Sequence, residues 1–387
     1  MGGRNPAKKP SRPGRPRRLP RAGGEGGAVP RGPDADEGAA LAASRDDGFV
    51  WSDSFGHKPV MLREALDCLQ VREDGFYVDA TLGGGGHSRA ILGRLGEGGR
   101  LLSLDVDPEP LAWARAWGGG DPRLILRRQN FSGLAGLLQS LGLGPADGVL
   151  ADLGLSSRQL LNGGRGFSFA ADGPLDMRLD PAARLSAAEI VNTYSEESLR
   201  NIFWRLGEER GAARLAGAVV EAREKAPFET TFELAGVASK TLARGGRPGR
   251  LHPATKAFMA LRLAVNGELD SLAEFLGAAR GCLRTGGRLV VISFHSLEDR
   301  LVKRALRGLP DSPPGPAEFL PPGPDARGGA SPAPFRQAGR GAETGTEATE
   351  GAARWRLVRR KAVRPSEDEL LDNPRARSAR LRAAEAV

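Results

Sequence analysis

The chain of 387 residues contains only two cysteines, Cys68 and Cys282, and no long hydrophobic run. A membrane-spanning helix needs about 20 consecutive apolar residues, so we expect none. One pair of cysteines far apart in the sequence cannot build a disulfide framework, which favours a protein of the reducing cytoplasm. The basic N-terminal segment has no apolar stretch behind its charges, so it is not expected to be a secretory signal.

Histidine is equally scarce. Metal sites bring histidine and cysteine ligands together at characteristic short spacings, and the four histidines show no such spacing. They are His57, His87, His252 and His295. We therefore expect no metal site.

Positive charge is abundant and collects at the two ends of the chain. Residues 1–33 contain nine Lys/Arg against one acid, and residues 354–382 contain ten against four, in a chain of net charge +9. Basic ends favour a polyanionic partner, although a solvated tail is the alternative. Residues 1–48 are rich in Pro, Gly and Arg, and residues 310–353 form a second low-complexity stretch. We expect a disordered tail and a long surface loop there.

Strand and helix patterns alternate over the first half of the remaining sequence. The predicted strands are Phe76–Val78, Arg100–Leu104, Leu124–Leu126, Gly148–Ala151 and Arg288–Ser293, with an edge strand at Arg356–Ala362. This alternation is typical of an α/β fold with a mostly parallel, doubly wound sheet. We assign it to residues 49–158, 263–309 and 354–387.

Residues 159–262 show helical patterns alone, which predicts an inserted all-helical domain. The predicted helices are Ala187–Thr193, Glu196–Leu206, Ala212–Ala226, Thr231–Leu242 and Ala254–Val265. Because the strand pattern resumes afterwards, the insertion is expected between the fourth and fifth strands.

The most informative segment joins the first predicted strand to a helix. It contains an acid and four glycines, in the order Asp79-Ala-Thr-Leu-Gly-Gly-Gly-Gly-His87-Ser88. Glycines let a ligand approach the backbone, and His87 or Ser88 can open a helix whose N-terminal amides face that ligand. A dinucleotide fingerprint has its glycines directly after an apolar strand, whereas Asp79 precedes these by four residues. An anionic rim suits a cofactor with an ammonium and a sulfonium better than a pyrophosphate; a plain tight turn is the alternative.

Two further residues at strand ends fit an adenosine. Asp105 ends the second strand, 22 residues after Gly83, where doubly wound sheets bind ribose hydroxyls. Phe131 follows the third strand, where it either covers an adenine or packs in the core. Asp107, before Pro108, is expected to cap the next helix. An acid that binds the ribose, as expected of Asp105, occurs in enzymes that use NAD and in enzymes that use S-adenosylmethionine, so it does not distinguish the two cofactors.

Asp152 ends the fourth strand and is the candidate catalytic residue. The exocyclic amine of a nucleobase is a poor nucleophile, and methyl transfer to it is helped by an acceptor that orients its N–H group. Gln159, seven residues later, is a candidate for binding the cofactor or the base edge. The alternative for Asp152 is a helix cap.

Several other segments carry aromatic, polar and basic residues that suit an unpaired base or a phosphate. They are Gly164–Phe169, Asp172–Arg178, His252–Lys256 with Arg262 and Asn266, Ser293–Arg300 and Asn373–Ser378. Among these residues, His295 either contacts the RNA or the reacting base, or caps the following helix.

Together these motifs closely resemble the bacterial small-subunit ribosomal RNA cytosine-N4 methyltransferases of the MraW or RsmH type. The matching segments are His57–Leu62, Asp79–Ser88, Asp152–Gln159, Arg165–Arg178, Gly207–Arg210, His252–Asn266, Ser293–Arg304 and Asn373–Ser378. The resemblance implies a Rossmann-like class I methyltransferase domain with an inserted substrate domain. It implies S-adenosylmethionine as cofactor and N4 of a decoding-centre cytidine in 16S ribosomal RNA, within the small subunit, as target. A homodimer is a further hypothesis.

The resemblance also implies which residues contact the cofactor. They are Gly85, Gly86, His87, Asp105, Phe131, Asp152 and Gln159. Two other classes stay open on the residues alone. Asp79 before the glycines argues against an NAD-dependent oxidoreductase, and Asp152 with the intact glycine turn argues against a non-catalytic RNA-binding or assembly factor.

Overall fold

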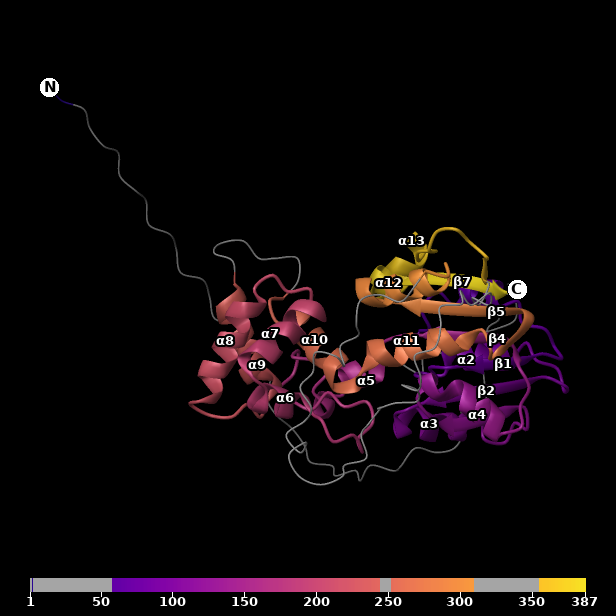
Figure 1. Cartoon of the computed structure of the whole chain (residues 1–387), viewed down its shortest axis with the longest axis horizontal. Coiled ribbons are helices and arrows are strands. Elements are labelled where there is room, and N and C mark those ends of the chain that lie inside the picture. The colour runs from indigo at the N-terminus through magenta and orange to yellow at the C-terminus, as the bar shows by residue number, and fades with distance from the viewer. Residues whose placement is uncertain (1, 3–57, 244–251, 310–354) are drawn as a thin grey trace, which may run out of the picture. The chain divides into compact units, whose positions relative to one another are not determined.

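The computed structural model describes Gly2 and residues 58–243, 252–309 and 355–387 (Figure 1). All the helices and strands belong to one unit, residues 51–387. The tail predicted at residues 1–48 and the loop predicted at residues 310–353 lie outside the described residues, apart from Gly2.

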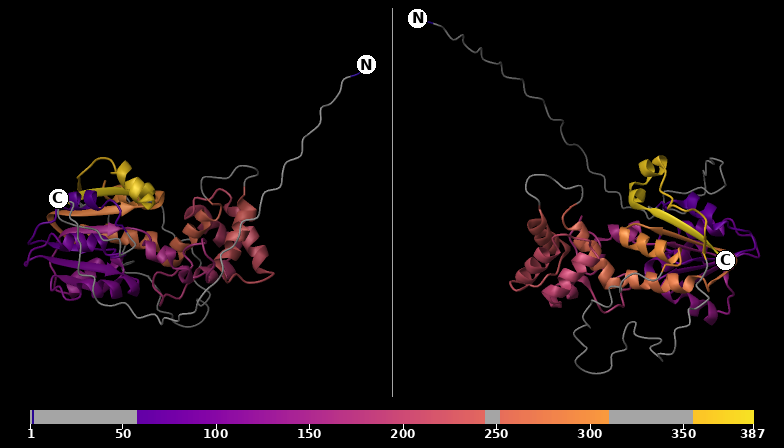
Figure 2. Two further views of the ribbon diagram at one scale, coloured as in Figure 1. Left: turned by 180° about the vertical axis from the view of Figure 1, so that it is seen from behind. Right: turned by 45° about the horizontal axis from the view of Figure 1, so that its top comes forward.

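Seven strands form one sheet in the order β3-β2-β1-β4-β5-β7-β6 (Figures 1 and 2). They are β1 (Phe76–Asp79), β2 (Arg100–Asp105), β3 (Leu124–Arg128), β4 (Ala146–Asp152), β5 (Leu283–Ser293), β6 (Trp355–Leu357) and β7 (Arg380–Ala386). The first five run parallel, and β7 runs antiparallel to β5 and β6. The strand order reverses between β1 and β4, and doubly wound sheets bind ligands beside such a point. The predicted fold class is confirmed.

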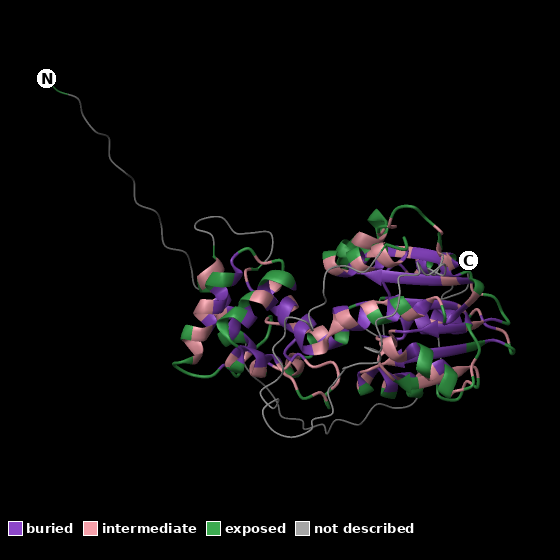
Figure 3. Cartoon of the chain, in the orientation of Figure 1, coloured by how far each residue is buried: buried purple, intermediate pink, exposed green. Residues whose placement is uncertain are grey.

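Helices cover both faces of the sheet. One layer contains α1 (Leu62–Leu69), α2 (Gly86–Leu92) and α3 (Pro108–Gly118), and the other contains α4 (Leu134–Ser140), α11 (Glu268–Ala279) and α12 (Ser296–Ala305). Successive strand residues point to opposite faces, so Val78 joins the core beneath α4 and α11, whereas Tyr77 packs on the opposite face. Figure 3 shows the strands largely buried, which explains their nearly continuous apolar sequences.

Between β4 and α11 the regular elements of the described chain are all helices. After α5 (Ser157–Leu161) and the 3₁₀ turn η3 (Gly163–Arg165) come α6 (Ala187–Thr193), α7 (Glu196–Arg205), α8 (Ala212–Arg223), α9 (Thr231–Leu242) and α10 (Thr255–Asn266). The last five bury a core of their own, which includes Ile190, Phe203 and Leu261. They match the predicted helices closely. Side-chain caps mark the starts of α6, α7 and α9, as in the capping box of Thr230 and Glu233.

The return from these helices to the sheet is short. Gly267, with φ of 56°, ends α10 and begins α11, whose buried side chains share a core with the strands. A left-handed residue at this position favours glycine. The domain boundary expected after residue 262 therefore falls inside α10 rather than between two elements.

The C-terminal part departs from the sequence prediction. The edge strand expected at Arg356–Ala362 is reduced to β6, and the unpredicted β7 lies between β6 and β5. The sequence of β7, RLRAAEA, has no β-branched residue, so its pattern gave no strand signal. Tertiary contacts hold it: Arg380 and Arg382 pair with Asp299 of α12 at 2.8 and 2.7 Å. The remaining elements are η2 (Phe131–Gly133), α13 (Glu367–Asp372) and η6 (Pro374–Ser378).

Membrane insertion was not expected from the sequence. Within the described ranges, no helix combines the length and the apolar character needed to cross a bilayer.

Candidate functional site

A large cavity opens at the carboxyl ends of β1, β2 and β4. Its lining comes from the glycine turn after β1, the ends of β2 to β4, residues 179–185, and parts of α10, α11 and α12. Six of the seven residues expected at the cofactor line it, and these are Gly86, His87, Asp105, Phe131, Asp152 and Gln159. Gly85 does not belong to the lining.

The glycine turn has the backbone that its sequence predicts. Gly83 and Gly85 have φ of 49° and 73°, in the region that favours glycine, and Gly85 is the N-cap of α2. A Cβ atom on Gly86 would lie 2.8 Å from Pro59, so a side chain there has no room. The helix begins at Gly86, one residue earlier than His87, and both of these residues line the cavity.

Asp79 is not part of the cavity rim, in contrast to the sequence expectation. It is fully buried and does not belong to the cavity lining. Its Oδ1 accepts a hydrogen bond from Thr81 N at 3.1 Å and its Oδ2 one from Ser88 Oγ at 2.6 Å. Asp79 lies on the strand face that α2 covers, and its two hydrogen bonds connect β1 to the residues at either end of the glycine turn. Burial raises its pKa to about 7.

Asp105 joins the glycine turn to the end of β2. Its Oδ2 accepts a hydrogen bond from Gly83 N, and its Oδ1 accepts one from Asp107 N, both at 2.9 Å. Burial raises the pKa of Asp105 to about 6. A carboxylate has about four acceptor sites, so two remain for ribose hydroxyls.

Phe131 packs against the core and also borders the cavity, so its place is compatible with both roles that the sequence allowed. It lines the cavity, and its ring also packs edge-to-face on Phe275 of α11 at a centroid distance of 5.4 Å. Packing on Phe275 fixes the ring that would cover an adenine.

Asp152 and His87 are neighbours in the lining of the cavity. Asp152 Oδ2 lies 3.6 Å from His87 Nδ1, while His87 Nε2 lies 3.1 Å from the carbonyl oxygen of Val60. Since a carbonyl only accepts, Nε2 carries the ring proton. Asp152 Oδ1 is buried and finds no hydrogen-bond partner among the described residues. Burial, together with the charges of Asp79 and Glu298, raises the pKa of Asp152 well above its usual range.

The alternative reading of Asp152 as a helix cap is wrong. Ser156 caps α5, and its hydroxyl accepts a hydrogen bond from Gln159 N at 3.4 Å. Gln159 completes this capping box by accepting from Ser156 N with its Oε1 at 2.9 Å. Asp152 therefore stands at the end of β4 with no cap to form.

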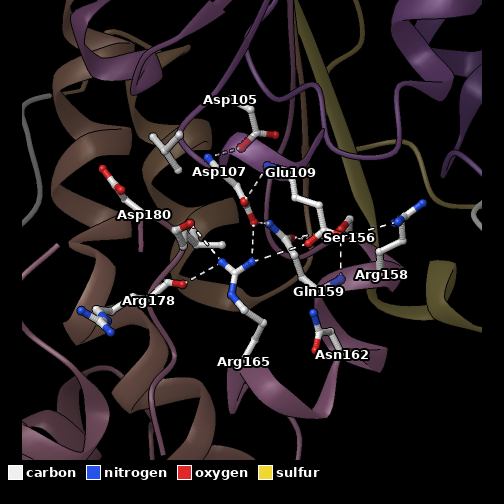
Figure 4. A network of polar contacts seen from close by, with 12 residues as sticks. Asp105, Asp107, Glu109, Ser156, Arg158, Gln159, Asn162, Arg165, Arg178 and Asp180 are labelled. Carbon is white, nitrogen blue, oxygen red and sulfur yellow. Dashed lines mark hydrogen bonds and ion pairs between the residues drawn. The ribbon is translucent and has the colours of Figure 1, made fainter. Parts of the chain in front are cut away.

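Gln159 belongs to a buried polar network that sequence reasoning missed (Figure 4). Its Nε2 donates to Asp107 Oδ2 at 2.9 Å, and Arg165 Nη1 approaches the same oxygen at 3.0 Å. Asp107 also caps α3, as predicted, by accepting from Glu109 N. Local patterns showed the cap, but not the partners, because they lie more than 50 residues away in the chain. Gln159 thus holds Asp107 from within the protein.

His295 caps α12, which was one of its two expected roles. Its Nδ1 accepts from Glu298 N at 3.4 Å, and Glu298 Oε2 accepts in return from His295 N. The side chain is only 11% exposed and also lines the cavity. No group of three or more metal-ligating side chains occurs in the part of the chain that the structure describes.

A glycine turn, a ribose-type acid and a further acid at the point of strand reversal define an α/β enzyme that binds an adenosine-containing cofactor. Residues 54–323 match the MraW methylase family. The chain is 48% identical over 332 residues to "Ribosomal RNA small subunit methyltransferase H" of Thermomicrobium roseum, which covers 86% of this chain and 94% of the relative. The relative of the same name from Syntrophobacter fumaroxidans is 45% identical over 333 residues, covering 85% and 96%.

The chain belongs to the MraW methylase family and is therefore a methyltransferase. The family expected from the sequence motifs is confirmed, and the oxidoreductase alternative falls. Membership implies S-adenosylmethionine as methyl donor. The chain's residues fit this cofactor: the acids suit its cationic sulfur and ribose, and Asp152 Oδ1 is an acceptor with no partner among the described residues. The homodimer and the cytoplasmic location stay predictions.

Proposed function

We propose that the protein transfers the methyl group of S-adenosylmethionine to the N4 amine of a decoding-centre cytidine in 16S ribosomal RNA. The relatives named as small-subunit ribosomal RNA methyltransferases support the RNA class. The cytosine amine is supported by the sequence motifs and by the chemistry of Asp152. The small ribosomal subunit is the proposed partner.

The cofactor contacts follow from the ends of the strands. Gly85, Gly86 and His87 form the N-terminus of α2, whose first amides would bind the carboxylate of the cofactor. Asp105 accepts hydrogen bonds from the ribose, and Phe131 covers the adenine. Gln159 acts through Asp107, which it holds beside Asp105.

Asp152 handles the proton of the reaction. The bound cofactor supplies an electrophilic methyl group on a positively charged sulfur. Asp152 Oδ1 accepts a hydrogen bond from the N4 amine, which aligns the nitrogen for attack. Methyl transfer would form the bond between N4 and the methyl carbon and break the bond between that carbon and sulfur, so that neutral S-adenosylhomocysteine leaves. N4 would give up one proton, and Asp152 Oδ1 would receive it. His87 Nδ1, which is unprotonated when Nε2 donates to Val60, lies 3.6 Å from the other carboxylate oxygen, Oδ2.

The single observation that carries this function is the unpartnered Oδ1 of Asp152 beside the glycine turn. Incubation with tritiated S-adenosylmethionine and small subunits that lack the modification tests it. We expect one methyl group per subunit, recovered as N4-methylcytidine. Binding without methyl incorporation would show a non-catalytic RNA-binding protein, and a methyl group on another base would refute the proposed target.

A further inference from the structure

His295 has a second ring nitrogen that its capping role leaves unused. Nδ1 accepts from the backbone of α12, so it carries no proton, and the neutral ring therefore has its proton on Nε2. Nε2 is buried and makes no hydrogen bond with any described residue. Glu298 Oε1 lies 3.0 Å from it, but outside the direction of a hydrogen bond. A buried donor that faces only a misaligned carboxylate is poorly satisfied, and the cap alone does not account for it.

This donor belongs to the same end of the sheet as the unpartnered acceptor of Asp152. Asp152 pairs with Ile292 across β4 and β5, and Leu153 N donates to Ile292 O at 2.9 Å. His295 follows Ile292 by three residues, and both His295 and Asp152 line the cavity. Glu298, which touches His295, is close enough for its charge to act on Asp152. Two residues of the cavity lining, at neighbouring strand ends, thus carry one buried acceptor and one buried donor that form no hydrogen bond within the described chain.

We propose that His295 determines the specificity for cytosine by donating its Nε2 proton to N3 of the target base, while Asp152 Oδ1 accepts from N4. This inference rests on the proposed function. The Watson–Crick edge of cytosine presents an amine donor at N4 next to an acceptor at N3. Enzymes that act on a base outside the helix read this edge through hydrogen bonds.

The same pair of groups rejects uracil. Uracil presents an acceptor at position 4 and a donor at N3, the reverse of cytosine. Asp152 would then face a carbonyl oxygen, and His295 would face an N–H group. Each mismatch leaves a buried group unpaired, and sites of this kind discriminate strongly against the wrong ligand.

Two substitutions separate the base contact from the helix cap. His295→Asn keeps a side-chain oxygen for the cap and removes the donor at the position of Nε2, since Asn is a preferred N-cap residue. His295→Gln places an amide donor near the position of Nε2. Ser296→Ala is the matched control. Ser296 is the first residue of the same helix, its hydroxyl donates to Glu208, and it does not line the cavity.

Each enzyme is assayed on reconstituted small subunits that carry cytidine or 3-deazacytidine at the target position. The analogue replaces N3 by C–H and keeps the N4 amine. For the unmodified enzyme and the Ser296→Ala control, we expect kcat/KM to fall about 10- to 100-fold on the analogue, as for loss of one specific base contact. The quantity compared is the ratio of kcat/KM on cytidine to kcat/KM on 3-deazacytidine. For His295→Asn we expect this ratio to fall to about 1 to 3, and for His295→Gln we expect it to stay near that of the unmodified enzyme. The intrinsic reactivity of the analogue cancels in this comparison.

The inference is overturned if His295→Asn keeps the full ratio, or if the unmodified enzyme treats both substrates alike. For a variant too slow to turn over, the same ratio is taken from binding affinities with S-adenosylhomocysteine present. Failure of the proposed function is distinguishable, because the unmodified enzyme would then leave N4 of cytidine unmethylated on normal subunits.

Discussion

Arg165 Nη1 lies 3.0 Å from Asp107 Oδ2, and this ion pair joins the segment after β4 to the loop that follows Asp105 (Figure 4). Asp107 is fully buried and Arg165 is only 18% exposed. The Nη2 group of Arg165 also donates to the carbonyl oxygens of Arg178 and Leu179. One guanidinium therefore fixes the cofactor side of the cavity and the loop that lines its other wall.

Arg165→Met should destabilise the protein and weaken cofactor binding. Removing one partner of a buried ion pair costs about 3–5 kcal/mol, because the other charge is left without compensation. Urea unfolding and calorimetric titration with the cofactor measure the two effects. Arg158→Ala is the matched control: its pair with Glu109 is exposed, so the loss should stay below about 1 kcal/mol. Equal effects of the two variants would contradict a role for the buried network.

Asp105→Ala should reduce the affinity for S-adenosylmethionine at least about tenfold, since each lost charged hydrogen bond is worth about 1.5–3 kcal/mol. The variant removes the acceptor for the ribose and also releases Gly83 N and Asp107 N. Calorimetric titration gives the dissociation constant. An unchanged constant would remove Asp105 from the cofactor site.

Asp152→Ala should slow methyl transfer about 10²- to 10⁴-fold, the range for loss of a positioned acid–base group. Single-turnover rates with saturating cofactor measure the chemical step. Asp152→Asn keeps an oxygen that orients the amine but takes up no proton, so its rate of methyl transfer should lie between those of the unmodified enzyme and Asp152→Ala. A turnover equal to that of the unmodified enzyme would exclude Asp152 as the group that receives the proton.

Cofactor binding should tighten between pH 5 and pH 7.5. Burial raises the pKa of Asp105 to about 6 and that of Asp79 to about 7, so the free protein holds these protons below those values. A cation in the cavity favours the ionised carboxylates, so binding releases protons. Calorimetry near pH 6, in buffers of different ionisation enthalpy, counts them. S-adenosylhomocysteine, with a neutral sulfur, should release fewer; equal release by both ligands would contradict this account.

The same shifts predict how the free protein's stability depends on pH. Between about pH 4 and pH 7 the folded state binds more protons at these two groups than the unfolded chain does. These groups therefore lower the free energy of unfolding as pH rises through that window. Asp79→Asn should flatten this part of the profile, which urea unfolding at several pH values measures.

Local sequence patterns predicted the helices, strands and caps that are determined by residues close together in the chain. The parallel strands, the helix α6 and the Asp107 cap belong to this group, because apolar periods and caps are local signals. β7 was missed, since its strand is held by pairing with β5 and not by its own propensity. The contact of Arg165 with Asp107 was missed because only the folded chain brings those residues together. Asp79 was placed at the rim because the pattern shows that an acid ends the strand, but not which face it points to.

A mass-spectrometric nucleoside map of 16S ribosomal RNA, from cells with and without this protein, tests the central claim most directly. We predict that a methyl group on N4 of one decoding-centre cytidine disappears when the protein is absent and returns when it is restored. An identical map in both cells, or loss of a methyl group from a different base, would contradict the account.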